Sequence, residues 1–269
     1  MAHSQTLQPV TIKSSADGGY FPAASSTATK DSAALRDIPQ SVNVVLKQLL
    51  QDQAARSMED ALKNVPGVAL SHGDGDGQRD QVTIRGFSAI ADQFVDGVRD
   101  DALYFRDLSN IERIEVLKGP LAVLYGRGSS GGLINRVTKK PIFGETTGDV
   151  TLNLGSYGLK RLSSDINLAL GEAVAFRLNL AKEDSDSSRA QQFIDRHSIA
   201  PSLAFKISAD TNLLLQVTNA KDKRVTDFGI PALNGKPVDV AVGTYYGSNK
   251  AREDALLPAP QAATPSKMN

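Results

Sequence analysis

The 269-residue sequence contains no cysteine, no excess of charge of either sign and no long apolar run. The absence of cysteine excludes a disulfide framework and thiolate metal sites. Lysine plus arginine and aspartate plus glutamate both total 30, so no net charge favours a nucleic-acid partner. No run of about 18 apolar residues is present, which excludes a membrane-spanning helix. Membrane-spanning strands remain allowed, because their apolar residues come only at every second position.

The sequence also lacks a recognisable catalytic or metal-binding set. The stretch Gly126-Arg-Gly-Ser-Ser-Gly-Gly132 invites a phosphate-loop or nucleophile interpretation. It lacks the Gly-Lys-Ser/Thr ending of a P-loop and the Gly-x-Ser-x-Gly elbow of a hydrolase. His72-Gly-Asp-Gly-Asp76 begins like a calcium loop, but Gln78 and Arg79 occupy the places that need an oxygen ligand and a glycine. The sequence therefore predicts no catalytic residue and no protein metal ligand.

The first half of the chain divides into two regions. Residues 1–36 are rich in small and polar residues with little periodicity, which predicts a flexible extension. In residues 37–141, apolar side chains fall at helical spacing from Ala54 to Val65, and short strand-like runs follow. The Pro-Gly pair after Val65 ends the predicted helix. This mixture predicts a small α+β domain with helices packed on a short sheet.

From Asp149 the pattern changes to strict alternation of apolar and polar residues. The alternating segments are Val150–Leu154, Arg161–Leu170, Val174–Ala181, Ile199–Ile207 and Leu213–Val217. Tight turns at 171–172 and 208–210 contrast with a predicted long polar loop at 183–197. Segments of about ten residues can cross a membrane as tilted strands, so residues 149–250 predict an antiparallel transmembrane β-barrel. A soluble sandwich is the alternative, because alternation alone does not separate the two.

Several ordered blocks resemble the plug domain of TonB-dependent outer-membrane siderophore receptors. The longest block runs from Ile111 to Pro141 and contains Lys118-Gly-Pro120 and the glycines after it. The others are Asp37-Ile-Pro-Gln-Ser-Val-Asn-Val-Val45, Ala61-Leu-Lys-Asn-Val-Pro-Gly-Val68, Val82-Thr-Ile-Arg-Gly-Phe87 and Phe94-Val-Asp-Gly-Val98. Ordered blocks are more specific than a single glycine motif. The resemblance implies a plug over residues 37–141 and a barrel of about 22 strands, of which residues 149–250 supply the first five or six.

The resemblance also implies which residues meet a ligand. In this family, outward plug loops touch a ferric siderophore, and the matching loops here are 73–80 and 99–107. A ferric catecholate is anionic and aromatic, which suits guanidinium and phenol side chains. The siderophore-binding residues implied in this way are Arg79, Tyr104, Phe105 and Arg106. Ordinary exposed loop residues are the alternative. The iron stays in its chelate, so no cofactor is implied.

Two further sets of residues follow from the resemblance. Thr6-Leu-Gln-Pro-Val-Thr-Ile12 resembles the TonB box, through which the energised partner TonB pulls such receptors; an ordinary disordered tail is the alternative. An extended segment can add a strand to a partner's sheet edge. The TonB-box residues implied are Thr6, Leu7, Pro9, Val10, Thr11 and Ile12. Arg85 and Arg127 match plug arginines that pair with barrel-wall glutamates and anchor the plug.

The predicted barrel does not finish. Residues 251–269 are rich in Pro and Ala, show no alternation and predict a non-barrel tail. We therefore expect a C-terminally truncated receptor. The residues after Met1 lack the basic start and the apolar core of an export signal, so we expect a mature chain or one that lost its leader.

The sequence thus predicts a transport protein and not an enzyme. The resemblance implies a cell outer-membrane TonB-dependent receptor for a ferric siderophore of the catecholate type, with TonB, the siderophore and outer-membrane lipid as partners and no nucleic acid. Unpaired strand edges in hydrocarbon cost several kcal/mol per group, so this chain alone is not expected to transport. A soluble periplasmic plug-like binding module and a non-functional gene remnant are the alternatives, and a fragment of this kind would be periplasmic or misfolded.

Overall fold

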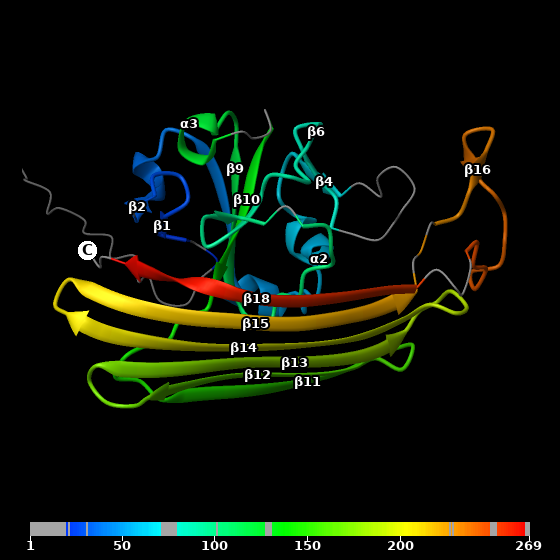
Figure 1. Cartoon of the computed structure of the whole chain (residues 1–269). Helices are drawn as coiled ribbons and strands as arrows, with labels where there is room; N and C mark the ends of the chain where they lie inside the picture. Colours follow the sequence, from blue (N-terminus) through cyan, green and yellow to red (C-terminus); the bar gives the residue numbers. More distant parts are fainter. Residues whose placement is uncertain are drawn as a thin grey trace, which may run out of the picture.

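The computed structural model of the protein describes residues 20, 22–30, 32–70, 80–100, 102–126, 131–225, 227, 229–247 and 252–266. Within them the chain forms a small globular domain, residues 22–141, and then a wide antiparallel sheet, which we term the wall. The long wall strands run across the view in Figure 1, and the globular domain stands above them. The predicted fold class is confirmed: an α+β domain precedes an open sheet of six barrel-type strands.

A five-stranded sheet forms the centre of the globular domain. Its order is β3-β9-β10-β7-β8, with β10 parallel to β7 and the other neighbours antiparallel. The strands are β3 (Ser41–Leu46), β7 (Gln93–Val95), β8 (Val98–Arg99), β9 (Ile111–Lys118) and β10 (Gly132–Thr138). Ile114, Val116 and Ile134 of β9 and β10 are fully buried in the main core cluster. Each such side chain contributes about 1.5–3 kcal/mol by burial, so the β9–β10 pair is the stable centre of this domain.

Short helices and a second small sheet cover this core. The helices are α1 (Lys47–Asp52), α2 (Met58–Leu62), α3 (Ala122–Tyr125) and the 3-10 turn Leu35–Asp37, and the small sheet is β4 (Val68–Leu70), β5 (Val82–Ile84) and β6 (Phe87–Ser88). The predicted helix before Pro66 is present, although it is only α2. A capping box between Ser57 and Asp60 starts it, because each side chain satisfies the other's free backbone N–H. No helix in the described part of the chain is long and apolar enough to cross a membrane.

The structure differs from the predicted flexible extension over residues 22–30 and 32–34, which form a docked strap. Its two short strands, β1 (Ala24–Ser25) and β2 (Ala33–Ala34), pair with each other. The fully buried carboxylate of Glu115 accepts hydrogen bonds from the Ser25 hydroxyl and from the Thr27 N–H, the latter at 3.1 Å. Composition alone missed this, because polar contacts to β9, and not apolar periodicity, hold the strap.

The Glu115 contacts predict a test of the strap. Hydrogen bonds to a charged group contribute about 1.5–3 kcal/mol each, so Glu115→Ala should release the strap. Tryptic cleavage after Lys30, followed by mass spectrometry, should accelerate about tenfold or more. Glu112→Ala on the same strand removes a carboxylate that the strap does not use and should leave the rate unchanged. Equal rates in both variants would contradict this account of the strap.

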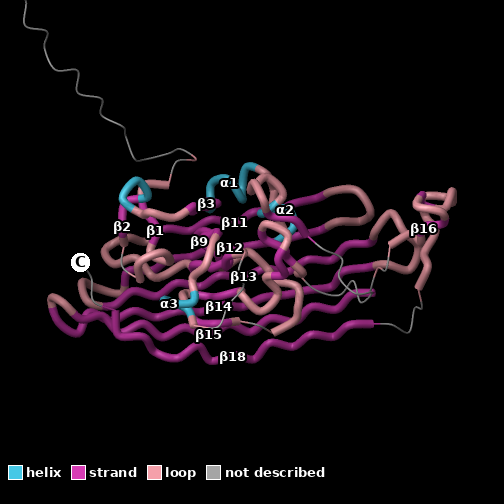
Figure 2. Tube along the Cα trace, turned by 90° about the horizontal axis from the view of Figure 1, so that it is seen from above, coloured by secondary structure: helices cyan, strands magenta, loops and turns pink. Residues whose placement is uncertain are grey.

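The wall contains six strands in the order β11-β12-β13-β14-β15-β18, and all neighbours are antiparallel. The first five are β11 (Thr147–Leu154), β12 (Lys160–Ala169), β13 (Val174–Asp186), β14 (Phe193–Ser208) and β15 (Thr211–Val225). They lie side by side beneath the globular domain in Figure 2. All five alternating segments of the sequence are therefore strands. Apolar side chains such as Leu152 and Val217 are exposed on the outer face, and polar side chains face the globular domain.

The predicted polar loop at 183–197 is much shorter in the structure. Strand β13 continues to Asp186 and β14 begins at Phe193, so the connection is residues 187–192. Some of the polar residues that suggested a loop are inward-facing strand residues. Glu183 and Arg196 are both buried and pair with each other, with Glu183 Oε2 2.6 Å from Arg196 Nη2. An inner barrel face that contacts a plug can carry charges, which removes the apolar signal of a strand.

The structure also differs from the prediction of a non-barrel tail at 251–269. Residues Arg252–Ser266 form β18, which pairs with β15 along most of its length. Pro258, Pro260 and Pro265 all pair with odd-numbered residues of β15 and therefore share one phase of the register. Proline lacks an amide donor and is accepted on an edge strand when that position faces away from the neighbouring strand. The prolines of residues 251–269 therefore did not justify the prediction of a non-barrel tail, because a strand at the edge of the described wall can contain them.

Candidate binding site

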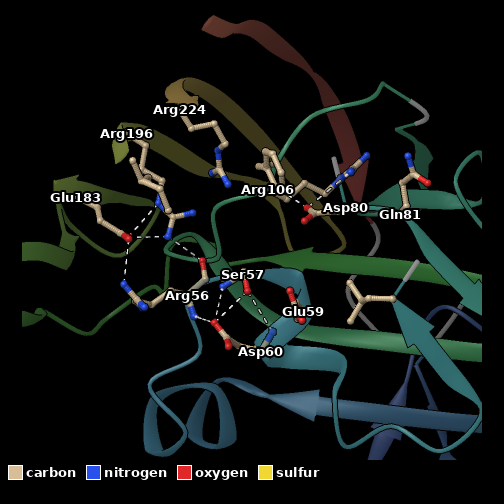
Figure 3. Close-up of a pocket in the computed structure, with 13 residues that line it drawn as sticks. Arg56, Ser57, Glu59, Asp60, Asp80, Gln81, Arg106, Glu183, Arg196 and Arg224 are labelled. Atoms are coloured by element: carbon tan, nitrogen blue, oxygen red, sulfur yellow. Dashed lines mark hydrogen bonds and ion pairs between the residues drawn. The ribbon is translucent and has the colours of Figure 1, made fainter. Parts of the chain in front are cut away.

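A pocket of about 320 Å³ opens between the globular domain and the wall, at the end where residues 155–159 and 187–192 connect the wall strands. We term it the loop-end pocket. Figure 3 shows Glu183 with Arg196 and Arg56 on one side of it, and Asp80 with Arg106 on the other. Four arginines and four carboxylates line the pocket, so its charge is balanced. Charge alone does not make this pocket selective for an anion.

Segment 102–107 places three of the predicted ligand-binding residues between the globular domain and the wall. Their side chains make different contacts there. Arg106 is only 1% exposed at its side chain. Its guanidinium donates to the backbone carbonyls of Asp100, Ala102 and Tyr104 at 3.1, 2.8 and 3.2 Å. Its backbone N–H donates to Asp80 at 2.8 Å. Arg106 therefore shapes this loop from within, and its donors are occupied by the protein itself.

Tyr104 and Phe105 lie on either side of that buried arginine. The Tyr104 hydroxyl donates to Asp100 at 2.7 Å, and its ring lies under the Arg106 guanidinium. Burial, followed by the nearby Asp100 carboxylate, raises the pKa of Tyr104, so its hydroxyl stays a donor at neutral pH. The Phe105 ring faces the wall, with the Arg224 guanidinium of β15 3.5 Å from its centroid. Of the predicted residues, Phe105 is the one that joins the loop-end pocket to the wall.

The other predicted residues are less informative. Arg79, Arg127 and the TonB-box residues Thr6, Leu7, Pro9, Val10, Thr11 and Ile12 lie outside the described residues. Arg85 lies on an exposed turn after β5 and forms no ion pair with any described residue, so its anchoring role stays a prediction.

A different set of charges joins the globular domain to the wall. Asp107 lies 2.9 Å from Arg161 of β12 and 3.7 Å from Arg196 of β14. Glu183 of β13 is 1% exposed and accepts from the same two arginines, and it also pairs with Arg56 at 3.1 Å. Alternation gave a sequence signal for Arg161 only, because Glu183 and Arg196 fell in the predicted loop at 183–197. The sequence did not predict which residues would pair. Arg56, for example, pairs with Glu183, which lies more than 120 residues away.

A second charged cluster lies nearer the tight-turn end of the wall. The Asp165 carboxylate of β12 pairs with Lys47, Lys139 and Arg177 at 3.2, 3.0 and 2.8 Å. Lys47 comes from α1 and Lys139 directly follows β10, whereas Arg177 comes from β13. Polar contacts add to this interface at Gln216, which donates to Thr138 at 3.0 Å. The globular domain is thus attached to β12, β13 and β14 through ion pairs and to β15 through hydrogen bonds.

The pKa of Asp107 makes part of this attachment dependent on pH. Burial alone would raise it, but the charges of Arg196 and Arg161 lower the pKa of Asp107 from 3.8 to about 2. A lowered pKa stabilises the folded state above pH 3.8, and this contribution is lost as pH falls toward 2. We expect the urea midpoint to drop between pH 5 and pH 2 by a component worth on the order of 2 kcal/mol.

The substitution Asp107→Asn isolates this component. At pH 7 the variant should already have the lower urea midpoint, and its midpoint should change less below pH 4 than that of the original chain. Asp210→Asn, in the exposed turn between β14 and β15, is the matched control and should keep the original pH profile. An unchanged acid profile in Asp107→Asn would contradict the role given to this carboxylate.

The same arrangement of domain and strands is found in known proteins. Residues 34–133 match the family model described as "TonB-dependent Receptor Plug Domain". The chain carries a TonB-dependent receptor plug domain and the first strands of the receptor barrel. It is 35% identical over 256 residues to the probable TonB-dependent receptor BfrD of Bordetella pertussis, covering 91% of this chain and 34% of BfrD. It is 33% identical over 208 residues to the catecholate siderophore receptor Fiu of Escherichia coli K12, covering 76% of this chain and 27% of Fiu.

Solved receptor structures agree with the placement of plug and wall. The closed form of the ferric-catecholate import receptor Fiu from Escherichia coli K12 superposes with a TM-score of 0.80 at 29% identity, covering 88% of this chain and 36% of that one. The siderophore receptor PiuA of Acinetobacter baumannii gives 0.77 at 30% identity, covering 82% and 33%. The chain therefore spans about a third of the length of the relatives it matches. The globular domain is the plug, and the wall is barrel.

Proposed function

We propose that this chain is the ligand-gathering part of an outer-membrane receptor that takes up a ferric siderophore of the catecholate class. Fiu, a catecholate receptor by name, supports the ligand class through both sequence and fold. The observation that carries the proposal is the position of segment 102–107, which presents Phe105 and Tyr104 at the gap between plug and wall. Aromatic walls bind the rings of a catecholate by stacking.

The absence of tryptophan in this chain gives a direct test. Phe105→Trp introduces a single reporter that keeps the ring over Arg224. Titrating ferric tris(2,3-dihydroxybenzoate) into the purified chain in detergent should quench this tryptophan saturably. Phe205→Trp, on β14, is the matched reporter placed away from the pocket and should show only weak linear quenching. Equal, non-saturable quenching of both would contradict the proposed ligand.

Two parts of the proposal concern partners and location. The segment Thr6–Ile12 is proposed to pair with a sheet edge of TonB, and a peptide of residues 1–19 should compete with the chain for the C-terminal domain of TonB. The wall is proposed to sit in the outer membrane. Heat-modifiable migration of the chain from outer-membrane fractions would support this location, whereas recovery only from the periplasm favours a soluble plug-like module, and absence from both favours a non-functional remnant.

A further inference from the structure

A second, larger cavity lies at the opposite end of the plug–wall gap. We term it the tight-turn chamber; it measures about 980 Å³. Thr147, Asn212 and Leu214 line it from the wall, and these residues lie near the strand ends next to the tight turns. Ser26 and Thr27 of the strap line its other side. The chamber is therefore separate from the loop-end pocket, which shares none of these residues.

The tight-turn chamber is cationic, in contrast to the balanced loop-end pocket. Its charged lining consists of five cations, Lys30, Lys47, Arg113, Lys140 and Arg177, and two carboxylates, Asp96 and Glu112. The Asp96 carboxylate already accepts from the Thr138 N–H and hydroxyl. It is therefore turned toward β10 and not toward the lysines. An electric field of one sign in a half-enclosed cavity concentrates ions of the opposite sign.

Two of these cations have no carboxylate partner among the described residues. Lys47, Arg113 and Arg177 pair with Asp165 or Glu115, so their charges are balanced by structural partners. Lys30 and Lys140 form no ion pair with any described residue. Lys30 lies over the Tyr125 ring, with its ammonium 4.1 Å from the centroid. The tight-turn chamber is thus lined by two lysines whose ammonium groups have no carboxylate partner among the described residues.

Two aromatic rings line the same chamber, each beside a lysine. The Tyr125 ring under Lys30 and the Phe143 ring under Lys206 both line the chamber or its edge. The Tyr125 hydroxyl donates to the Thr27 carbonyl at 2.6 Å, which holds the ring in place. An anionic ligand with flat rings would meet both charge and stacking partners here. The volume is within the range of sites for small ligands.

We propose that the tight-turn chamber is a transit site for an anionic chelate that leaves the loop-end pocket. The inference rests on the proposed function, because the ligand must first enter the plug–wall gap. A charged ligand then moves from a pocket of balanced charge to a cationic chamber, which favours passage toward the tight-turn side. Lys30 and Lys140 supply the attraction, and Phe143 and Tyr125 supply the apolar walls.

Two single-tryptophan chains test the chamber separately from the loop-end pocket. Phe143→Trp reports on the chamber, and Phe105→Trp reports on the loop-end pocket. The probes are citrate, a small polyanion without rings, and ferric tris(2,3-dihydroxybenzoate), an anionic chelate with rings. Each reporter is combined with Lys30→Gln and Lys140→Gln, or with the control pair Lys63→Gln and Lys236→Gln, which are exposed lysines outside the chamber.

The proposal predicts saturable change of the Phe143→Trp signal with the chelate. Lys30→Gln with Lys140→Gln should raise its Kd about tenfold, while the control pair and the Phe105→Trp signal stay unchanged. Added salt should weaken the chamber signal as well. Saturation at Phe105→Trp without any at Phe143→Trp would overturn the chamber and leave the proposed function intact.

Other outcomes also decide the question. Binding at Phe143→Trp that ignores the two lysine substitutions would overturn the electrostatic basis of the chamber. Saturation by citrate alone would overturn the transit role, since the chamber would then select a free polycarboxylate. No saturation at either reporter would count against the proposed function first, and the chamber would fall with it.

Discussion

Gly132→Ala is expected to prevent the plug from folding. A Cβ at this position would lie 2.0 Å from the Leu117 carbonyl oxygen and 2.9 Å from the Lys118 Cα. The backbone there has φ of +141°, a conformation that side chains other than glycine rarely adopt. Gly132 begins β10 and pairs with Lys118 at the end of β9, so the clash falls on paired backbone atoms and not on a flexible side chain. We expect a loss of about 4–5 kcal/mol or more, which exceeds what most single substitutions cause.

Gly148→Ala is the matched control for this prediction. Gly148 lies in β11, where an added Cβ would meet nothing within 4 Å. Urea unfolding of the plug, followed by protease resistance of residues 37–141, should show full loss in Gly132→Ala and little change in Gly148→Ala. A Gly132→Ala plug as resistant as the original would mean that β9 and β10 do not pair in the register Gly132 with Lys118.

Glu183→Gln should weaken the attachment of the plug to the wall. The Glu183 side chain is 1% exposed, and three arginines surround it: Arg161, Arg196 and Arg56. Removing its charge leaves the guanidinium groups of Arg161 and Arg196, each 7% exposed, with only Asp107 to balance them. Breaking a buried ion pair on one side costs about 3–5 kcal/mol, because the remaining charge is unpaired. The urea midpoint of the chain in detergent should fall accordingly.

Glu172→Gln provides the control for that measurement. Glu172 lies in the exposed turn between β12 and β13, where a charge contributes little. Combining Glu183→Gln with Asp107→Asn should be strongly non-additive, since both carboxylates share the same arginines. A Glu183→Gln chain within about 0.5 kcal/mol of the original would show that this cluster does not hold the plug.

The sequence predicted the elements of this fold well where one local rule decided the structure. The glycines before β10 predicted sharp backbone geometry, and Gly132 has it. Alternation from Asp149 predicted β11 to β15, because lipid-facing apolar residues come at every second position. The same alternation placed Arg161 and Asp165 on the inner face, where both are buried in ion pairs.

Features that depend on distant partners were not predictable in the same way. The strap has no periodicity, and the groups that dock it, such as the buried carboxylate of Glu115 and the Tyr125 hydroxyl, come from distant parts of the sequence. Arg106 was expected to face a ligand because the resemblance implies an outward plug loop at 99–107 and a guanidinium suits an anionic chelate. In the structure, the carbonyls of its own loop surround it. Local composition does not contain that information, since it follows from how the loop closes.

The seating of the plug on the wall can be measured directly, because the chain has no cysteine of its own. Asn110 of the plug lies 3.5 Å from Thr218 of β15 through their side chains. Cysteines at these two positions, treated with a short bismaleimide, should give the cross-linked 110–218 peptide. Val217 is exposed on the opposite face of β15, so a 110–217 cysteine pair should not cross-link. Equal yields from both pairs, or none from 110–218, would contradict a plug seated on the inner face of the wall.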